Sequence, residues 1–186
     1  TILAVDDEPI NLQVMVNHLK DLNYRLLTAN NGIEALKIVE REVPDLILLD
    51  LMMPTLSGYE VCKTLRLKYP IHTLPIIILS AKNQINDIIL GLEIGANDYM
   101  HKPLHKKELL SRIHNQLSIK QAIEDNSRLI TMEKELQTAR KIQADILPDK
   151  IPIMEGIKIS TTYLPMQTVG GDLYDFHIKS KTEIGI

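Results

Sequence analysis

The sequence predicts an α/β domain with a doubly wound parallel sheet, followed by one long helix. Short aliphatic runs alternate with amphipathic stretches over residues 1–104, which is the pattern of successive βαβ units. In two of the runs, at 46–49 and 76–79, apolar residues stand at consecutive positions. Such strands are covered on both faces, as in the centre of a parallel sheet. Residues 105–147 contain neither glycine nor proline, which predicts the helix.

The aliphatic runs give the expected strands, and the stretches between them give the expected helices. We expect strands at residues 2–5, 25–29, 45–50, 74–80 and 97–102. Helices are expected near residues 9–22, 32–42, 57–68 and 84–94, joined to the strands by right-handed crossovers. The only cysteine, Cys62, falls in one helical pattern and is expected to pack in the core. A single cysteine forms no internal disulfide, so a cytoplasmic location is expected.

The predicted long helix ends before Pro148 and Pro152 and would extend about 65 Å at 1.5 Å per residue. Its heptad positions fall in two frames: Ile119, Ala122, the polar Asn126 and Leu129, then Leu129, Met132, Leu136, Ala139 and Ile146. Neighbouring positions are three or four residues apart, except for the seven residues from Ala139 to Ile146. This broken heptad pattern favours a coiled-coil homodimer. A long helix that folds back on its own domain is the alternative.

The bulk composition excludes some classes of partner. The 186 residues are 45% hydrophobic and 24% charged, with a formal net charge of −3. We therefore expect no nucleic-acid partner. No apolar run approaches the roughly 20 residues that cross a bilayer, so no membrane segment is expected. The start at Thr1, without methionine, and the end at Ile186 in an expected strand suggest a fragment.

Three acidic residues are predicted to meet at one edge of the sheet. Asp6 and Asp7 follow the first strand, and Asp50 ends the otherwise apolar third strand. Ligands bind outside the carboxyl ends of strands in parallel sheets. Carboxylates gathered there repel one another unless a hard cation such as Mg²⁺ lies between them. Asp7 alone could instead cap a helix that opens at Pro9.

The fourth and fifth strands add further polar groups at the same edge. Ser80 ends the fourth strand, and Lys102 ends the fifth. Taken singly, Ser80 could be a helix cap and Lys102 a solvated surface residue. Together with the acids, these residue types suit a site that holds a metal and a phosphoryl group at once.

Four segments resemble the response-regulator receiver family of two-component systems: AVDDEP (4–9), LLDLMMPTLSGYE (48–60), ILSA (78–81) and DYMHKP (98–103). The resemblance implies a flavodoxin-like five-stranded sheet in the order 2-1-3-4-5. It also implies that Asp50 accepts a phosphoryl group from a histidine kinase or phosphotransfer protein.

The same resemblance implies roles for the surrounding residues. Asp7, Asp50 and the backbone carbonyl of Met52 would bind Mg²⁺, with Asp6 assisting through water. Lys102, before a cis Pro103, would neutralise the phosphoryl oxygens. Ser80, which would also contact the phosphoryl group, and Tyr99 would be the switch residues that couple phosphorylation to a change of the surface. Gly58 matches the family's glycine after the Met-Pro turn.

The segments ELQTARKIQADILPDKIP (135–152) and YLPMQTVGGDLYDFH (163–177) resemble the start of SpoIIE/RsbU-type serine/threonine phosphatases, which are related to protein phosphatase 2C. The resemblance implies a partial α+β phosphatase segment, with a metal-binding Asp172 beside Gly170 and Gly171. Separately, the alternation of IKISTTYL (157–164) between two faces predicts a strand there. A complete phosphatase would use Mn²⁺ or Mg²⁺. The alternative for VGGDLYDF is a glycine turn followed by an acidic hairpin.

The expected organisation is a receiver at 1–104, a helical linker at 105–147 and the start of a phosphatase at 148–186. The expected function is a response regulator whose phosphorylation at Asp50 acts through the linker on the phosphatase. The chain as given is expected to lack phosphatase activity. The family's typical substrate is a phosphorylated anti-sigma-factor antagonist. The alternatives are an adaptor that dimerises or docks on phosphorylation, and a phosphotransfer sink.

Overall fold

The computed structural model describes residues 1–81, 85–148, 150–154, 156, 158–163, 170, 173–180 and 183–186. Five parallel strands form one sheet in the order β2-β1-β3-β4-β5. The strands are β1 (Ile2–Val5), β2 (Leu26–Ala29), β3 (Leu46–Asp50), β4 (Ile76–Ser80) and β5 (Asp98–His101). This is the predicted flavodoxin-like sheet, and each strand lies inside its expected range.

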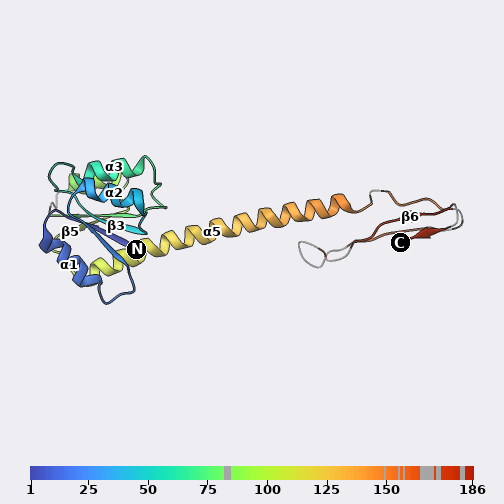
Figure 1. The fold of residues 1–186 in the computed structure, drawn as a ribbon, viewed down its shortest axis with the longest axis horizontal. Coiled ribbons are helices and arrows are strands. Elements are labelled where there is room, and N and C mark those ends of the chain that lie inside the picture. Colours follow the sequence, from blue (N-terminus) through green and yellow to red (C-terminus); the bar gives the residue numbers. More distant parts are fainter. Residues whose placement is uncertain are drawn as a thin grey trace. The chain divides into compact units, whose positions relative to one another are not determined.

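Helices cover both faces of the sheet, as expected for a doubly wound fold (Figure 1). Their bounds are α1 (Pro9–Leu19), α2 (Gly32–Arg41), α3 (Gly58–Arg66), α4 (Ile85–Glu93) and α5 (Lys106–Ile146). Alternate residues of each strand point to opposite faces. Leu3 and Ile47 therefore pack with α2 and α3, whereas Ile2 and Leu46 pack with α1 and the start of α5.

Local sequence signals explain where several helices begin. The Asn31 side chain accepts a hydrogen bond from the Glu34 amide at 2.8 Å and caps α2. Ser57 and Glu60 form a capping box at the start of α3. Proline is the first residue of α1, where its missing N–H costs no helical hydrogen bond. The signals at α1 and α3 fix the ends of the loops that follow Asp6, Asp7 and Asp50.

The helix α5 begins and ends within one residue of the expected 105–147. Of its 41 residues, only Leu109 and Ile113 are buried. The chain divides within this helix into two compact units, residues 1–124 and 125–186. Among the described residues, no helix is long and apolar enough to cross a membrane.

The C-terminal unit contains a short antiparallel pair, β6 (His177–Ile178) and β7 (Ile184–Gly185). The strand expected at 157–164 is wrong for its described residues 158–163, which form no regular structure. Alternation of apolar residues does not suffice for a strand, because its backbone groups also need a hydrogen-bonded neighbour. Within the described residues, no strand pairs with 158–163. Gly171 and the predicted metal ligand Asp172 lie outside the described residues.

Candidate functional site

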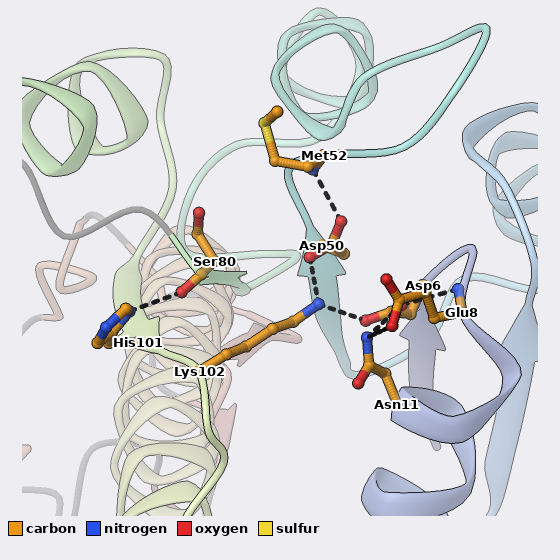
Figure 2. A network of polar contacts seen from close by, with 8 residues as sticks. All are labelled: Asp6, Glu8, Asn11, Asp50, Met52, Ser80, His101 and Lys102. Atoms are coloured by element: carbon orange, nitrogen blue, oxygen red, sulfur yellow. Dashed lines mark hydrogen bonds and ion pairs between the residues drawn. The ribbon is translucent and has the colours of Figure 1, made fainter.

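Asp50 lies at the carboxyl end of the central strand β3 and is 3% exposed. One of its carboxylate oxygens accepts a hydrogen bond from the Met52 amide at 2.7 Å. The other oxygen lies 2.5 Å from the ammonium of Lys102 (Figure 2). The carboxylate is thus fixed by one backbone donor and one cation, as a buried charge requires.

Asp6 is the second acid of the pocket, and it is fully buried at the end of β1. Its Oδ2 lies 2.7 Å from the same Lys102 ammonium. Its Oδ1 accepts hydrogen bonds from the Glu8 amide and from the Asn11 side chain, each at 3.0 Å. Figure 2 shows the resulting chain of contacts from Asn11 through Asp6 and Lys102 to Asp50.

The pKa values of Asp50 and Lys102 depend on two opposing effects, burial of the charges and their pairing with each other. Burial raises the pKa of Asp50 above its usual value, and the ion pair with Lys102 offsets this only in part. Burial works against the charge of Lys102, but the hydrogen bonds and charges of Asp50 and Asp6 outweigh it and raise the pKa of the ammonium. The lysine therefore stays charged between two carboxylates near neutral pH.

The position of Asp7 differs from the prediction that three acidic side chains converge in one pocket. Asp7 is half-buried and lines a cavity of about 830 Å³ together with residues of α2 and with Pro54 and Thr55. In the described part of the chain, no three carboxylate, histidine or cysteine side chains gather closely enough to hold a metal ion. Successive side chains at a strand end point in different directions, so Asp6 joins Asp50 whereas Asp7 faces the cavity.

The donor set of the pocket nevertheless suits a magnesium ion. Two buried carboxylates already share one cation, since Lys102 reaches both within 2.7 Å. Their oxygens are the hard ligands that Mg²⁺ prefers, and this ion commonly keeps several waters beside one or two carboxylates. Two protein carboxylates therefore fit the usual Mg²⁺ coordination.

The predicted switch residues lie on the neighbouring strands. Ser80 is fully buried at the end of β4, and its backbone carbonyl accepts hydrogen bonds from the Lys102 amide and the His101 ring. Tyr99 is 8% exposed and packs in the core on β5. A Cβ atom added at Gly91 of α4 would lie 3.6 Å from the Tyr99 ring, an ordinary van der Waals distance, so α4 passes close to this ring.

Gly58 has a steric role at the site. A Cβ atom added there would lie 2.1 Å from the carbonyl oxygen of Asp50. The glycine amide donates to the carbonyl of Leu51 at 3.1 Å, which draws the start of α3 against the end of β3. Only a residue without a side chain allows this approach. The cis peptide expected before Pro103 is also present.

Two residues of the network were missed from the sequence, Asn11 and Glu8. Besides bonding Asp6, the Asn11 amide donates to the Glu8 carboxylate at 3.2 Å. The signal available was an asparagine five residues after Asp6, in the first turn of the expected helix. Helical geometry places such a residue near the loop before the helix.

Residues 2–114 match the family model described as "Response regulator receiver domain". The match covers more than half of the chain, including every residue of the pocket. The chain belongs to the response-regulator receiver family. Receiver domains typically bind Mg²⁺ and are phosphorylated by histidine kinases.

The curated relatives of this receiver domain match it over part of their length. The Porphyra purpurea protein named "Probable transcriptional regulator ycf27" is 47% identical over 116 residues, which are 62% of this chain and 46% of that protein. The alkaline phosphatase synthesis transcriptional regulatory protein PhoP of Bacillus subtilis strain 168 is 46% identical over 112 residues, 60% of this chain and 46% of PhoP. The chain thus spans about half the length of these relatives.

Solved receiver structures share the fold. The receiver domain of the Francisella response regulator 1452 is 33% identical with a TM-score of 0.59, covering 63% of this chain and 95% of that one. The Vibrio cholerae chemotaxis protein CheY4 is 30% identical with a TM-score of 0.58, covering 61% of this chain and 95% of that one. Both likenesses concern the receiver part alone.

Proposed function

We propose that Asp50 of this receiver accepts a phosphoryl group from the phosphohistidine of a histidine kinase or phosphotransfer protein. The observation that carries the proposal is the buried Asp50 carboxylate, 2.5 Å from Lys102 and linked through it to Asp6. An Asp50 oxygen attacks the phosphorus, the P–N bond to the donor imidazole breaks, and the leaving nitrogen takes a proton. The product is an acyl phosphate on Asp50.

The other pocket residues position and neutralise this group. The lysine ammonium, held between the two acids, would move its hydrogen bonds to the new phosphoryl oxygens. Asp7, once its side chain turns toward the pocket, would bind Mg²⁺ together with Asp50 and the carbonyl of Met52, and Asp6 would assist through water. Bound Mg²⁺ supplies positive charge against the phosphoryl oxygens. The Met52 amide holds one Asp50 oxygen, and the other becomes free to react once Lys102 moves its hydrogen bond to the phosphoryl group.

Ser80 and Tyr99 are the proposed switch. The dianionic phosphoryl group would attract the Ser80 hydroxyl, which ends the strand beside β3. Tyr99 lies on the next strand, against α4. A change at Ser80 would therefore alter the space beside the tyrosine ring and bias the surface formed by α4 and β5.

For the output, we propose a metal-dependent serine/threonine phosphatase joined to the receiver (1–104) through the helical linker (105–147). Support comes from the SpoIIE/RsbU-like segments at 135–152 and 163–177. In this proposal Asp172, with Mn²⁺ or Mg²⁺, belongs to the phosphatase metal site. A phosphorylated anti-sigma-factor antagonist is the proposed substrate.

Two other outputs compete with this proposal. The alternative in which the receiver is a phosphorylation-dependent adaptor needs only the receiver and the exposed helix α5. Transcription regulation is favoured by the names of the two curated relatives. Their similarity spans 112–116 residues of this chain, whereas the phosphatase-like segments begin at residue 135.

The phosphoryl acceptor is tested by mass spectrometry of the chain after incubation with Mg²⁺ and acetyl phosphate. We expect the mass of one phosphoryl group, located on the Asp50 peptide, and none after Asp50→Asn or in EDTA. The matched control is Asp45→Asn at the other end of the same strand, which should label like the original chain. Persistent labelling of the Asp50→Asn protein contradicts the assignment.

The output is tested on the intact gene product. Its hydrolysis of a phosphoserine peptide with Mn²⁺ is measured before and after phosphorylation of Asp50, and in an Asp172→Asn variant. We expect activity that depends on Asp172 and changes with phosphorylation. Binding of a partner protein on phosphorylation, without hydrolysis, would support the adaptor instead.

A further inference from the structure

The second half of α5 carries a row of apolar side chains that face solvent. Leu129, Met132 and Leu136 are 61%, 58% and 44% exposed. Helices in proteins are stabilised mainly by packing of an apolar face. A row of large apolar residues on a helix therefore indicates a surface that another element covers.

The spacing of this row is that of a coiled coil. Leu129, Met132, Leu136 and Ala139 follow one another at intervals of three, four and three residues. These are successive a and d positions of a heptad, with the leucines at a. The next a position is Gln143, whose side-chain amide pairs with the backbone of Gly170 at 2.6 and 2.9 Å. The uninterrupted apolar row thus ends at Ala139, one heptad before the exposed Ile146.

The charges beside this row decide which partner fits. The g positions are Arg128 and Glu135, and the e positions are Glu133 and Arg140. In a parallel, in-register pair of identical helices, each g residue faces the e residue five positions later on the other helix. Arg128 would then face Glu133, and Glu135 would face Arg140. Each of these pairs joins opposite charges.

The charged residues are available for such contacts. In the described part of the chain, Glu133, Glu135 and Arg140 make no ion pair within the chain. Arg128 approaches Asp125 one turn earlier at 3.9 Å, a loose contact between exposed side chains. The pairing pattern therefore does not arise from contacts along a single helix, which join residues three or four apart.

We infer that residues 128–140 of α5 bind the same segment of a second copy of this chain as a parallel, in-register coiled coil. The partner is chosen by charge, since the segment is complementary to itself in this orientation. Upstream, Asn126, Leu129 and Met132 follow at two consecutive three-residue intervals. Such a break locally overwinds a coiled coil, so the pairing frame changes at Leu129. This dimer does not require phosphorylation of Asp50.

The experiment uses sedimentation velocity of the intact chain and of two charge variants. Glu135→Arg puts arginines opposite each other at two places in the dimer, and Arg140→Glu does the same with glutamates. We expect each variant alone to dimerise about tenfold more weakly than the original chain. The matched control is Lys134→Glu, which changes the net charge as Arg140→Glu does but lies on the outer face of the helix. It should dimerise like the original chain.

Mixing the two variants gives the sharpest result. A Glu135→Arg chain and an Arg140→Glu chain restore opposite charges at both positions, so the mixture should form heterodimers as strong as the original dimer. If the original chain dimerises but the mixture of variants does not recover that dimerisation, the helices pair in another orientation or through another surface. That result would overturn the proposal. A chain that stays monomeric at all concentrations would also overturn it, as would dimers that persist equally in Leu136→Lys.

Discussion

The ammonium of Lys102 lies 2.5 Å from the carboxylate of Asp50, although the two residues are 52 positions apart in the chain. The contact joins the ends of β5 and β3, which are separated by β4 in the sheet. The same ammonium reaches Asp6 at the end of β1. One lysine therefore ties together three strands of the sheet and neutralises two buried acids.

Replacing Lys102 by methionine should destabilise the receiver by about 3 kcal/mol at neutral pH, because it leaves buried carboxylates without their cation. Urea unfolding measures the loss. The loss should shrink on acidification, as Asp50 becomes protonated, and also on addition of Mg²⁺. Lys106→Met is the control, since it removes an exposed pair with Asp21 and should cost under about 1 kcal/mol. Equal losses in both variants would contradict the role of Lys102.

Asp45, which precedes β3, and Asp50, which ends it, should affect stability with opposite dependence on pH. Burial holds the pKa of Asp50 above its usual value, so its ionised form destabilises the folded state. Asp50→Asn should therefore stabilise the protein at neutral pH. That gain should disappear as the pH falls through the raised pKa of Asp50 toward the value of an unfolded aspartate.

Asp45 provides the opposite case. Burial alone would raise its pKa, but hydrogen bonds from the Thr1 amine and from Lys120 lower it. Its ionised form stabilises the fold, so Asp45→Asn should destabilise the protein at neutral pH. This loss should vanish as the pH falls through the lowered pKa. Urea unfolding over a pH series checks both variants, and parallel pH profiles would refute the expectation.

Asn11 should act as a positioning residue for Asp6. Its amide fixes the Asp6 oxygen that does not face Lys102. Loss of such a support typically weakens metal binding about 10–100-fold, so Asn11→Ala should weaken Mg²⁺ binding by that order. Titration calorimetry measures the change. Gln13→Ala, on the exposed side of the same helix, should leave the Mg²⁺ affinity unchanged, and an equal loss there would point to a general disturbance of α1.

Gly58→Ala should destabilise the receiver by about 1–3 kcal/mol, the usual cost of overpacking. The new Cβ would overlap the carbonyl oxygen of Asp50 and force α3 away from β3. Thermal unfolding gives the loss, and labelling by acetyl phosphate should weaken with it. Gly185→Ala is the control, because its nearest atom would lie at 3.9 Å. If the stability of Gly58→Ala is unchanged, the loop between β3 and α3 can shift to make room for the new Cβ atom.

The thiol of Cys62 should react slowly with a disulfide reagent in the folded protein. It is fully buried in α3, and burial raises its pKa, which suppresses the reactive thiolate. Labelling should become fast in urea concentrations that unfold the receiver. Fast labelling under native conditions would show that this part of α3 opens readily.

The sequence by itself determined the order of strands and helices and the edge at which the polar residues gather. Periodicity carries this information, because continuous apolar runs must be covered on both faces and parallel strands end at one edge. It also indicated the long helix through the missing glycine and proline. Asp50, Lys102 and Ser80 were found in this way, because each ends a strand.

Only the tertiary structure decided how these residues are paired. Side-chain directions at a strand end separate Asp7 from Asp6, and the fold of α1 brings Asn11 to the Asp6 carboxylate. The close approach of α3 to β3 gave Gly58 its steric role. The strand expected from alternation at 157–164 was absent from 158–163, because pairing depends on a neighbour that local sequence does not specify. Contacts between distant residues require the packed sheet, and no local pattern encodes them.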